Sequence, residues 1–204
     1  MQVPEERVLG ADRLPARPGF PMPTFVILLR AVNVGSTGKL LMTDFKKLLS
    51  DCNCRNVLTY IQSGNAVVDA RSTAPALVRS VAAALARHMG SAVPVIVRTG
   101  EELERVIAGN PFAREAAADG SRVHAVFLSA TPPPAKAKDL EQIVKKYPAR
   151  HDRFHLAGDT LYLHLPDGAA ETKFTAQNID RALGVTATAR NWNTVLKLHA
   201  LAAR

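Results

Sequence analysis

The sequence predicts an α+β protein formed by tandem duplication of a ferredoxin-like (split β-α-β) unit, with two antiparallel sheets and helices packed on one face of each. Two observations predict it. Segments typical of strands and helices follow the order β-α-β-β-α-β-α twice, over about 85–90 residues each time, which is too long for a solenoid repeat. The ends of the two halves also correspond, "LARHMGSAVPVIVRTGEELERVIA" beside "IDRALGVTATARNWNTVLKLHALA". We therefore divide the chain into an extension (1–21), a first subdomain (22–112) and a second (113–204).

The extension differs from the rest of the chain. Residues 1–21 are rich in Pro and Arg, lack hydrophobic periodicity, and contain no apolar core of the kind a signal peptide needs. Met22 stands immediately before the first strand-like run. We expect either that Met22 is the functional start or that residues 1–21 form a flexible arm.

The first half opens with a continuous apolar run, "TFVILLR" (24–30), typical of a central strand buried on both faces. "TDFKKLLSDC" (43–52) has apolar residues at helical spacing, and Thr43 is a candidate cap for its first turn. "NVLTYIQ" and "AVVDA" predict two strands around a Ser-Gly-Asn turn. An Ala-rich helix, "APALVRSVAAALARHM", should end at Gly90.

The strand "AVPVIVRT" follows, and then a helix with Thr99 and Glu102 at capping-box spacing. The second half repeats this order, with "RVHAVFLS" as a strand, "AKAKDLEQIVKKY" as a helix and "RFHLAGDTLYLHLP" as a hairpin. "TKFTAQNIDRAL" predicts a helix that ends at Gly184, and "TATAR" a short strand. Asn191 is positioned to cap the last helix.

The charge favours anionic partners. The formal net charge is +8, and it divides evenly between the two halves while the extension contributes none. A basic surface attracts nucleic acid, nucleotides or phosphorylated metabolites, although an Arg-rich composition alone would also explain the charge. No run of about 18 apolar residues predicts a membrane span, so we expect no membrane partner.

The two cysteines, Cys52 and Cys54, lie one residue apart and so point to opposite sides of a strand, which suits a disulfide poorly. They lack the second pair that a zinc site would have. We interpret them as reduced thiols of a cytoplasmic protein. We expect neither a metal nor a cofactor, and the sequence leaves open whether the protein is an enzyme.

Topology predicts a polar edge in the first half. In a split β-α-β unit the first two strands run parallel, because a crossover helix connects them. The loop after the first strand, "RAVNVGSTGK", should therefore lie beside the hairpin tip "QSGN". The residues predicted to converge there as a ligand-binding site are Arg30, Asn33, Gly35, Lys39, Gln62, Ser63, Gly64 and Asn65.

The second half serves as a comparison, because its equivalent segments are only "SATPPPAK" and "AGDT". A turn needs Gly64 but not the polar residues around it, so Gln62 and Asn65 are the candidates for binding. The polar residues of the second half gather at the opposite edge, where Lys173, Arg190 and Asn191 are further candidates for ligand binding. Lys173 and Arg190 could neutralise an anion there or simply be solvated.

Several stretches together resemble the domain-of-unknown-function 1697 family: "FVILLRAVNVGSTGKLLMTDFKKLL", "TYIQSGNAVV", "NPF", "VFLS", "LYLHLPDG…TK" and "TARNWNTVLKL". The similarity covers roughly residues 23–200 in order. It differs where Ser36 and Thr37 follow "NVG", since the family often has a pair of Gly there. The resemblance implies a bacterial-type cytoplasmic protein with a two-part α+β fold, and it implies no established activity.

Three functions remain open. The first is binding of a small anionic ligand, a nucleotide or phosphorylated metabolite, at the polar edge. The second is nucleic-acid binding through the basic surface, although "AVVDA" offers none of the aromatic residues that an RNA-recognition sheet displays. The third is a non-catalytic interaction or oligomerisation module. The sequence favours the first, and it leaves the oligomeric state undetermined.

Overall fold

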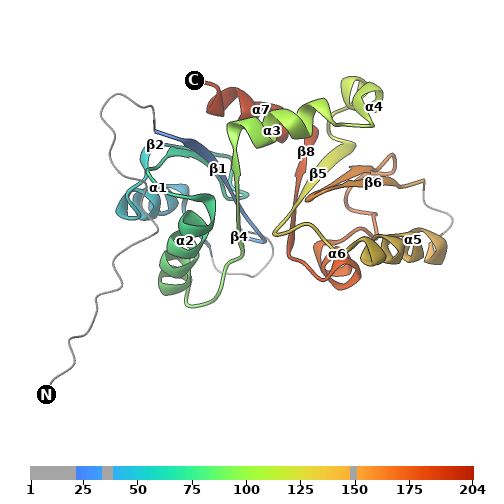
Figure 1. Cartoon of the computed structure of the whole chain (residues 1–204), viewed down its shortest axis with the longest axis horizontal. Coiled ribbons are helices and arrows are strands. Elements are labelled where there is room, and N and C mark those ends of the chain that lie inside the picture. The colour runs from blue at the N-terminus through green and yellow to red at the C-terminus, as the bar shows by residue number, and fades with distance from the viewer. Residues whose placement is uncertain (1–21, 34–38, 148–150) are drawn as a thin grey trace, which may run out of the picture.

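The computed structural model describes residues 22–33, 39–147 and 151–204. It contains two four-stranded sheets, sheet A with strand order β2-β3-β1-β4 and sheet B with order β6-β7-β5-β8 (Figure 1). The elements of the first half are β1 (Thr24–Leu29), α1 (Met42–Asp51), β2 (Arg55–Tyr60), β3 (Asn65–Asp69), α2 (Ala74–Met89), β4 (Val95–Thr99) and α3 (Gly100–Ala108).

The elements of the second half are α4 (Ala113–Ala118), β5 (Val123–Leu128), η1 (Pro134–Lys136), α5 (Ala137–Lys146), β6 (Arg153–Ala157), β7 (Thr160–His164), α6 (Ala176–Leu183), β8 (Ala187–Asn191) and α7 (Trp192–Ala202). Only α4 and the 3₁₀ turn η1 were not predicted from the sequence. Neither buries a residue, so neither has the apolar stripe that marks a helix in a sequence.

The strand directions confirm the predicted fold class. Strand β3 pairs antiparallel with both β1 and β2, so β1 and β2 run parallel, as a split β-α-β unit requires. Sheet B repeats the arrangement, because β7 pairs antiparallel with both β5 and β6. The chain is thus an α+β protein with two ferredoxin-like sheets.

Local capping signals set most of the helix ends. Thr99 and Glu102 form the predicted capping box at the start of α3. Gly90 and Gly184 end α2 and α6 in the left-handed conformation, with φ of 69° and 72°. The predicted cap at Thr43 is wrong, because α1 already begins at Met42 and its N-terminal side-chain cap is missing.

The core has three layers of apolar contact. Phe25, Ile27 and Leu29 of β1 face α1 and α2, while Val26 and Leu28 face the other way, so β1 is buried on both faces as predicted. On the far side of sheet B, a separate cluster packs that sheet against α5 and α6. Figure 1 shows these two helix pairs on the outer faces of the two sheets.

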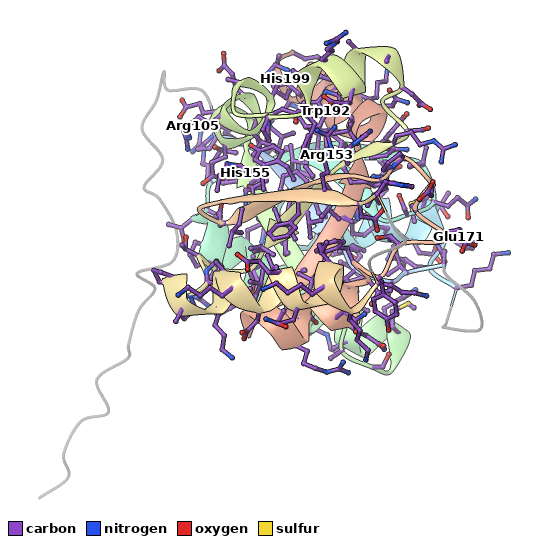
Figure 2. All side chains as sticks on the ribbon, turned by 90° about the vertical axis from the view of Figure 1, so that its right-hand side faces the viewer. Arg105, Arg153, His155, Glu171, Trp192 and His199 are labelled. Atoms are coloured by element: carbon purple, nitrogen blue, oxygen red, sulfur yellow. The ribbon has the colours of Figure 1, made fainter. Side chains whose placement is uncertain are left out.

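The third cluster is shared by the two halves. It joins the inner faces of both sheets with α3 and α7, and Leu103 of α3, Val195 of α7 and Phe127 of β5 belong to it. The last helix of each half therefore covers the sheet face opposite its other helices, and α3 and α7 lie together across the two sheets (Figure 1). Trp192 is buried in this cluster, on the same side of β6 as Arg153 and His155 (Figure 2).

The described residues offer neither a membrane-spanning helix nor a cluster of metal ligands. No helix there is both long enough and apolar enough to cross a membrane. No three His, Cys, Asp or Glu side chains within the same residues gather closely enough to hold a metal ion.

Candidate functional site

The predicted polar edge lies where β1 ends beside the hairpin tip between β2 and β3. The backbone N–H of Leu29 donates to the carbonyl of Gly64 at 2.8 Å, which continues the sheet to the tip of the hairpin. Asn33 then joins the two segments through its side chain, since Nδ2 donates to the carbonyl of Gln62 at 2.8 Å. The segments that topology predicted to be neighbours are therefore in direct contact.

Asn33 also closes the loop that follows β1. Its Nδ2 donates to the carbonyl of Leu40 at 2.9 Å, and its Oδ1 accepts from the backbone N–H of Leu40 at 2.8 Å. The side chain thus replaces a pair of backbone hydrogen bonds across the loop. Asn33 shapes the edge, and its amide is already engaged with the protein.

The most unexpected feature of the edge is an arginine from the second half. Arg190 of β8 is 7 % exposed, and its guanidinium enters the end of sheet A. It donates to Asn65 Oδ1, Thr188 Oγ1 (2.9 Å), the carbonyl of Ala189 (2.8 Å), the carbonyl of Leu29 (2.7 Å) and the carbonyl of Ser63 (3.2 Å). Burial lowers the pKa of Arg190 to about 10, so the side chain remains a cation at neutral pH.

Asn65 is the partner that holds this arginine. Its side chain is fully buried, its Oδ1 accepts from Arg190 Nε, and its Nδ2 donates to the carbonyl of Tyr60 at 3.1 Å and to Ser63 Oγ at 2.9 Å. Both polar atoms of the amide are engaged inside the protein. The polar hairpin tip therefore serves first to join the two halves, a role that the sequence alone did not suggest.

The same arrangement occurs a second time, with the halves exchanged. Arg98 of β4 is buried, and it donates to the carbonyl of Leu128 at 2.6 Å and to that of Val97 at 3.0 Å, as Arg190 does to the carbonyls of Leu29 and Ala189. Each half thus inserts an arginine into the end of the other half's first strand. The duplication produces a pseudo-twofold relation between these two arginine contacts, which we call the cross-half joints.

The two joints differ in charge. Arg98 forms an ion pair with Asp159, whose carboxylate is 2.9 Å from Arg98 Nη2 and whose side chain is 46 % exposed. Arg190 has the neutral amide of Asn65 in place of a carboxylate, and every acceptor that the described structure gives it is neutral. The polar edge therefore carries a buried positive charge without a direct counter-ion.

Comparison with known proteins identifies the family of this chain. The family described as "Protein of unknown function (DUF1697)" matches residues 22–162. The chain belongs to the DUF1697 family. This confirms the resemblance in the sequence, and the matched residues include the hairpin tip but not Arg190.

A solved structure of similar fold is that of the conserved bacterial protein SP0830 from Streptococcus pneumoniae. It is 18 % identical to this DUF1697 chain, covers 90 % of it and 99 % of its own length, and superposes with a TM-score of 0.68. At this identity the likeness shows the fold alone. No curated protein matches the chain.

In this DUF1697 protein a second cross-half contact lies at the same edge. Arg30, immediately after β1, forms an ion pair with Asp180 of α6, and both side chains are partly exposed. Asp180 Oδ1 also accepts from the backbone N–H of Ala187 at 2.9 Å. Asp180 thus offsets the charge of Arg30, which leaves Arg190 and the exposed Lys39 as the excess positive charge among the described residues of the edge.

The backbone of the edge is strained. Ala31, Asn33 and Ile61 have φ of 55°, 58° and 48°, and they are three of the five residues other than Gly with positive φ in the described chain. This conformation suits Asn, but it is unfavourable for a β-branched residue such as Ile61. Strain of this kind persists only where the surroundings enforce it, and it gathers at functional sites.

The remaining predicted residues are distributed as follows. Gln62 is exposed and Ser63 partly buried at the hairpin tip, while Gly35 lies outside the described residues. Lys173 and Asn191 do not join them. Lys173 Nζ lies 5.5 Å from the centre of the Tyr147 ring, and Asn191 caps α7 by accepting from the backbone N–H of Thr194 at 3.0 Å.

The grouping of Arg190 with Lys173 and Asn191 at a separate edge is wrong for Arg190, because its side chain crosses into the first half. Sequence reasoning also missed Arg98. Its signal was present in the internal repeat, where "PVIVRT" aligns with "TATARN" and places Arg98 and Arg190 at equivalent positions. A cation at the same place in both copies indicates a shared structural role.

Proposed function

We propose that this is a cytoplasmic protein that binds a small anionic ligand, a nucleotide or phosphorylated metabolite, at the polar edge of the first half. The observation that supports this most is that the buried Arg190 has no carboxylate partner among the described residues, whereas its counterpart Arg98 has one. A buried cation without a counter-ion is unfavourable, and an anion bound nearby would offset part of that cost.

The exposed groups of the edge suit such a ligand. Lys39 supplies an exposed positive charge, and Gln62 supplies an amide that can donate hydrogen bonds. Ser63 Oγ already accepts from Asn65 Nδ2, so its hydroxyl hydrogen is left to donate. In this proposal Lys39, Gln62 and Ser63 contact the ligand. The positive charge of Arg190, which is buried behind Asn65, attracts the ligand without contacting it.

The cross-half ion pair supplies the second wall of the proposed site. The Arg30 guanidinium is held by Asp180 of α6, so part of the site comes from each half. The pairing fixes its donors in place, and guanidinium donors suit phosphate oxygens.

The two cysteines have no disulfide partner, which agrees with a cytoplasmic location.

A thermal-shift titration tests the proposal. The probes are pyrophosphate, AMP and glucose 6-phosphate, and the variants are Lys39→Ala and Gln62→Ala. A ligand at 100 times its Kd adds about 2.7 kcal/mol to the free energy of unfolding, which raises the Tm of a chain of this size by about 5–10 °C. Both variants should lose most of that shift while keeping the unliganded Tm.

Lys197→Ala is the matched control, because it also removes an exposed lysine but from α7, outside the polar edge. The proposal is wrong if no probe raises the Tm, or if the control loses as much of the shift as Lys39→Ala. A short single-stranded DNA is included in the titration. Stabilisation by DNA alone, lost steeply as salt rises, would instead support nucleic-acid binding.

A further inference from the structure

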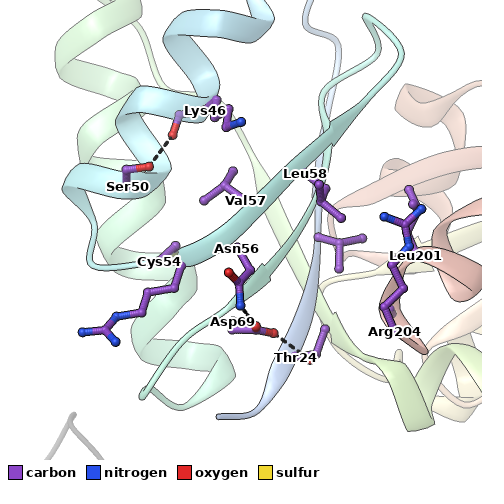
Figure 3. A pocket seen from close by; sticks show the side chains of 13 residues that line it. Thr24, Lys46, Ser50, Cys54, Asn56, Val57, Leu58, Asp69, Leu201 and Arg204 are labelled. Carbon is purple, nitrogen blue, oxygen red and sulfur yellow. Dashed lines mark hydrogen bonds between the residues drawn. The ribbon is translucent and has the colours of Figure 1, made fainter.

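A second surface, distinct from the polar edge, lies along the free side of β2. It is an open groove of about 700 Å³ bounded by α1, β2, β3 and the C-terminal end of α7 (Figure 3). Strand β2 is terminal in sheet A, and among the described residues its partner strand is β3. Its outward backbone N–H and C=O groups therefore face the groove, and such an edge is a template for pairing with another strand.

The floor of the groove offers apolar contacts on both sides of this strand. Val57 points toward α1, and Leu58 points to the opposite side, toward the end of α7 where Leu201 lies (Figure 3). Val57 and Leu201 are buried and Leu58 is partly exposed. A strand added beside β2 would place its successive side chains on these two sides in turn.

The charge of the groove is positive. Lys46 of α1, Arg55 of β2 and Arg204 after α7 line it, and none of the three forms an ion pair within the described part of the chain. Asp69 is the acidic residue of the lining, and its carboxylate already accepts from Thr24 Oγ1 at 2.8 Å and from Asn56 Nδ2 at 2.7 Å. The three cations are therefore left to attract an acidic partner.

The same charge argues against self-pairing. A second copy that paired β2 with β2 would bring the same cations from both chains to one interface, and like charges in such a pairing are destabilising. The irregular start of β2 limits the free edge further, because the register shifts between Arg55 and Leu58 and Asn56 has a φ of 49°. The regular edge is thus short, as for a peptide rather than for a whole sheet.

We propose that the free edge of β2 binds an extended acidic peptide segment of a partner protein as an added strand. Backbone hydrogen bonds to β2 hold the segment, and its alternate apolar side chains pack beside Leu58 and Leu201, on the side of β2 opposite Val57. Acidic side chains of the segment pair with Lys46 and Arg55. The surface is an interaction site for a protein and needs no part of the polar edge.

Fluorescence anisotropy tests this with the full chain and three labelled peptides. The first alternates Glu with Val, the second alternates Lys with Val, and the third is the Glu-Val peptide with alternate backbone nitrogens methylated. We expect binding of the first at micromolar concentration and at least tenfold weaker binding of the other two. Equal binding of the methylated peptide would overturn strand addition, and equal binding of the Lys peptide would overturn the charge argument.

Two variants locate the site. Arg55→Glu and Lys46→Glu should each weaken binding of the Glu-Val peptide at least tenfold, because each reverses a charge in the groove. Arg87→Glu is the control, since Arg87 is exposed in the last turn of α2 and outside the groove, and it should change Kd less than twofold. A control as damaging as Arg55→Glu overturns the proposal, as does displacement of the peptide by single-stranded DNA at equal concentration.

Discussion

Replacing Arg190 with Met tests whether the cross-half joint stabilises the fold. The substitution removes the guanidinium of the second half that donates hydrogen bonds to Asn65 Oδ1 and to the carbonyl of Ser63. The carbonyl of Leu29 keeps one donor, because it still accepts from Thr188 Oγ1 at 3.2 Å. Leaving a buried acceptor unsatisfied costs about 1–3 kcal/mol. Asn65 Oδ1 is buried and the carbonyl of Ser63 is partly buried, so the two together cost up to about 6 kcal/mol.

Part of this loss is recovered, because Met does not have to bury a charge without a counter-ion. We therefore expect Arg190→Met to lower the free energy of unfolding by about 3 kcal/mol, a large fraction of the stability of an ordinary domain. Urea denaturation followed by circular dichroism measures it. With the usual dependence on urea for a small protein, the midpoint should fall by about 1–3 M.

Arg181→Met is the matched control for charge. Arg181 is exposed on α6, and its guanidinium donates to Asn178 Oδ1 at 3.3 Å, so its loss should change the free energy of unfolding by less than about 0.5 kcal/mol. A loss below about 1 kcal/mol for Arg190→Met would refute the reasoning. So would equal losses in the two variants, because the net charge and not the buried bonds would then decide stability.

Three further predictions concern single sites. Gly64→Ala should cost about 2–4 kcal/mol in urea denaturation, since Gly64 has φ of 75° and its new Cβ would lie 2.6 Å from Val32 Cγ2; Gly158→Ala, with φ of 57° and open space around it, should cost only about 1 kcal/mol. Burial lowers the pKa of His124, so the unfolded chain gains its proton first as pH falls below about 6.5. His124→Gln should then reduce the slope of the free energy of unfolding against pH in this acidic range by up to about 1.4 kcal/mol per pH unit. An unchanged slope would contradict this. Burial raises the pKa of Cys54 to about 11, so iodoacetamide at pH 8 should leave this thiol intact in the folded protein and modify it in urea, as mass spectrometry would show; rapid native labelling would contradict the assignment.

The order of elements and one polar contact could be predicted from the sequence. Hydrophobic periodicity predicted the strands and the main helices, and capping residues such as Thr99 and Gly90 predicted where helices begin or end. These signals are local, because a cap or a turn acts on residues within about four positions. The proximity of Asn33 and Gln62 followed from topology, since two parallel strands bring their ends to one edge.

The position of Arg190 was decided by tertiary structure. Its contacts with Asn65 and Ser63 join residues 125 and 127 positions apart, and nothing in the local sequence around either segment encodes them. The same holds for α7, which ends the second half in sequence yet packs against β1 and β3 of the first.

Both features follow from how the two copies pack. Local patterns show which face of each sheet is apolar, whereas the relative placement of two such faces depends on contacts between surfaces distant in the chain. The β2 groove arises in the same way, because it forms only where the end of α7 reaches the free edge of sheet A. The sequence by itself therefore determined the two ferredoxin-like units and the polar hairpin tip. Only the tertiary structure decided that the tip holds a buried arginine, because the free energy of that contact depends on both halves being folded together.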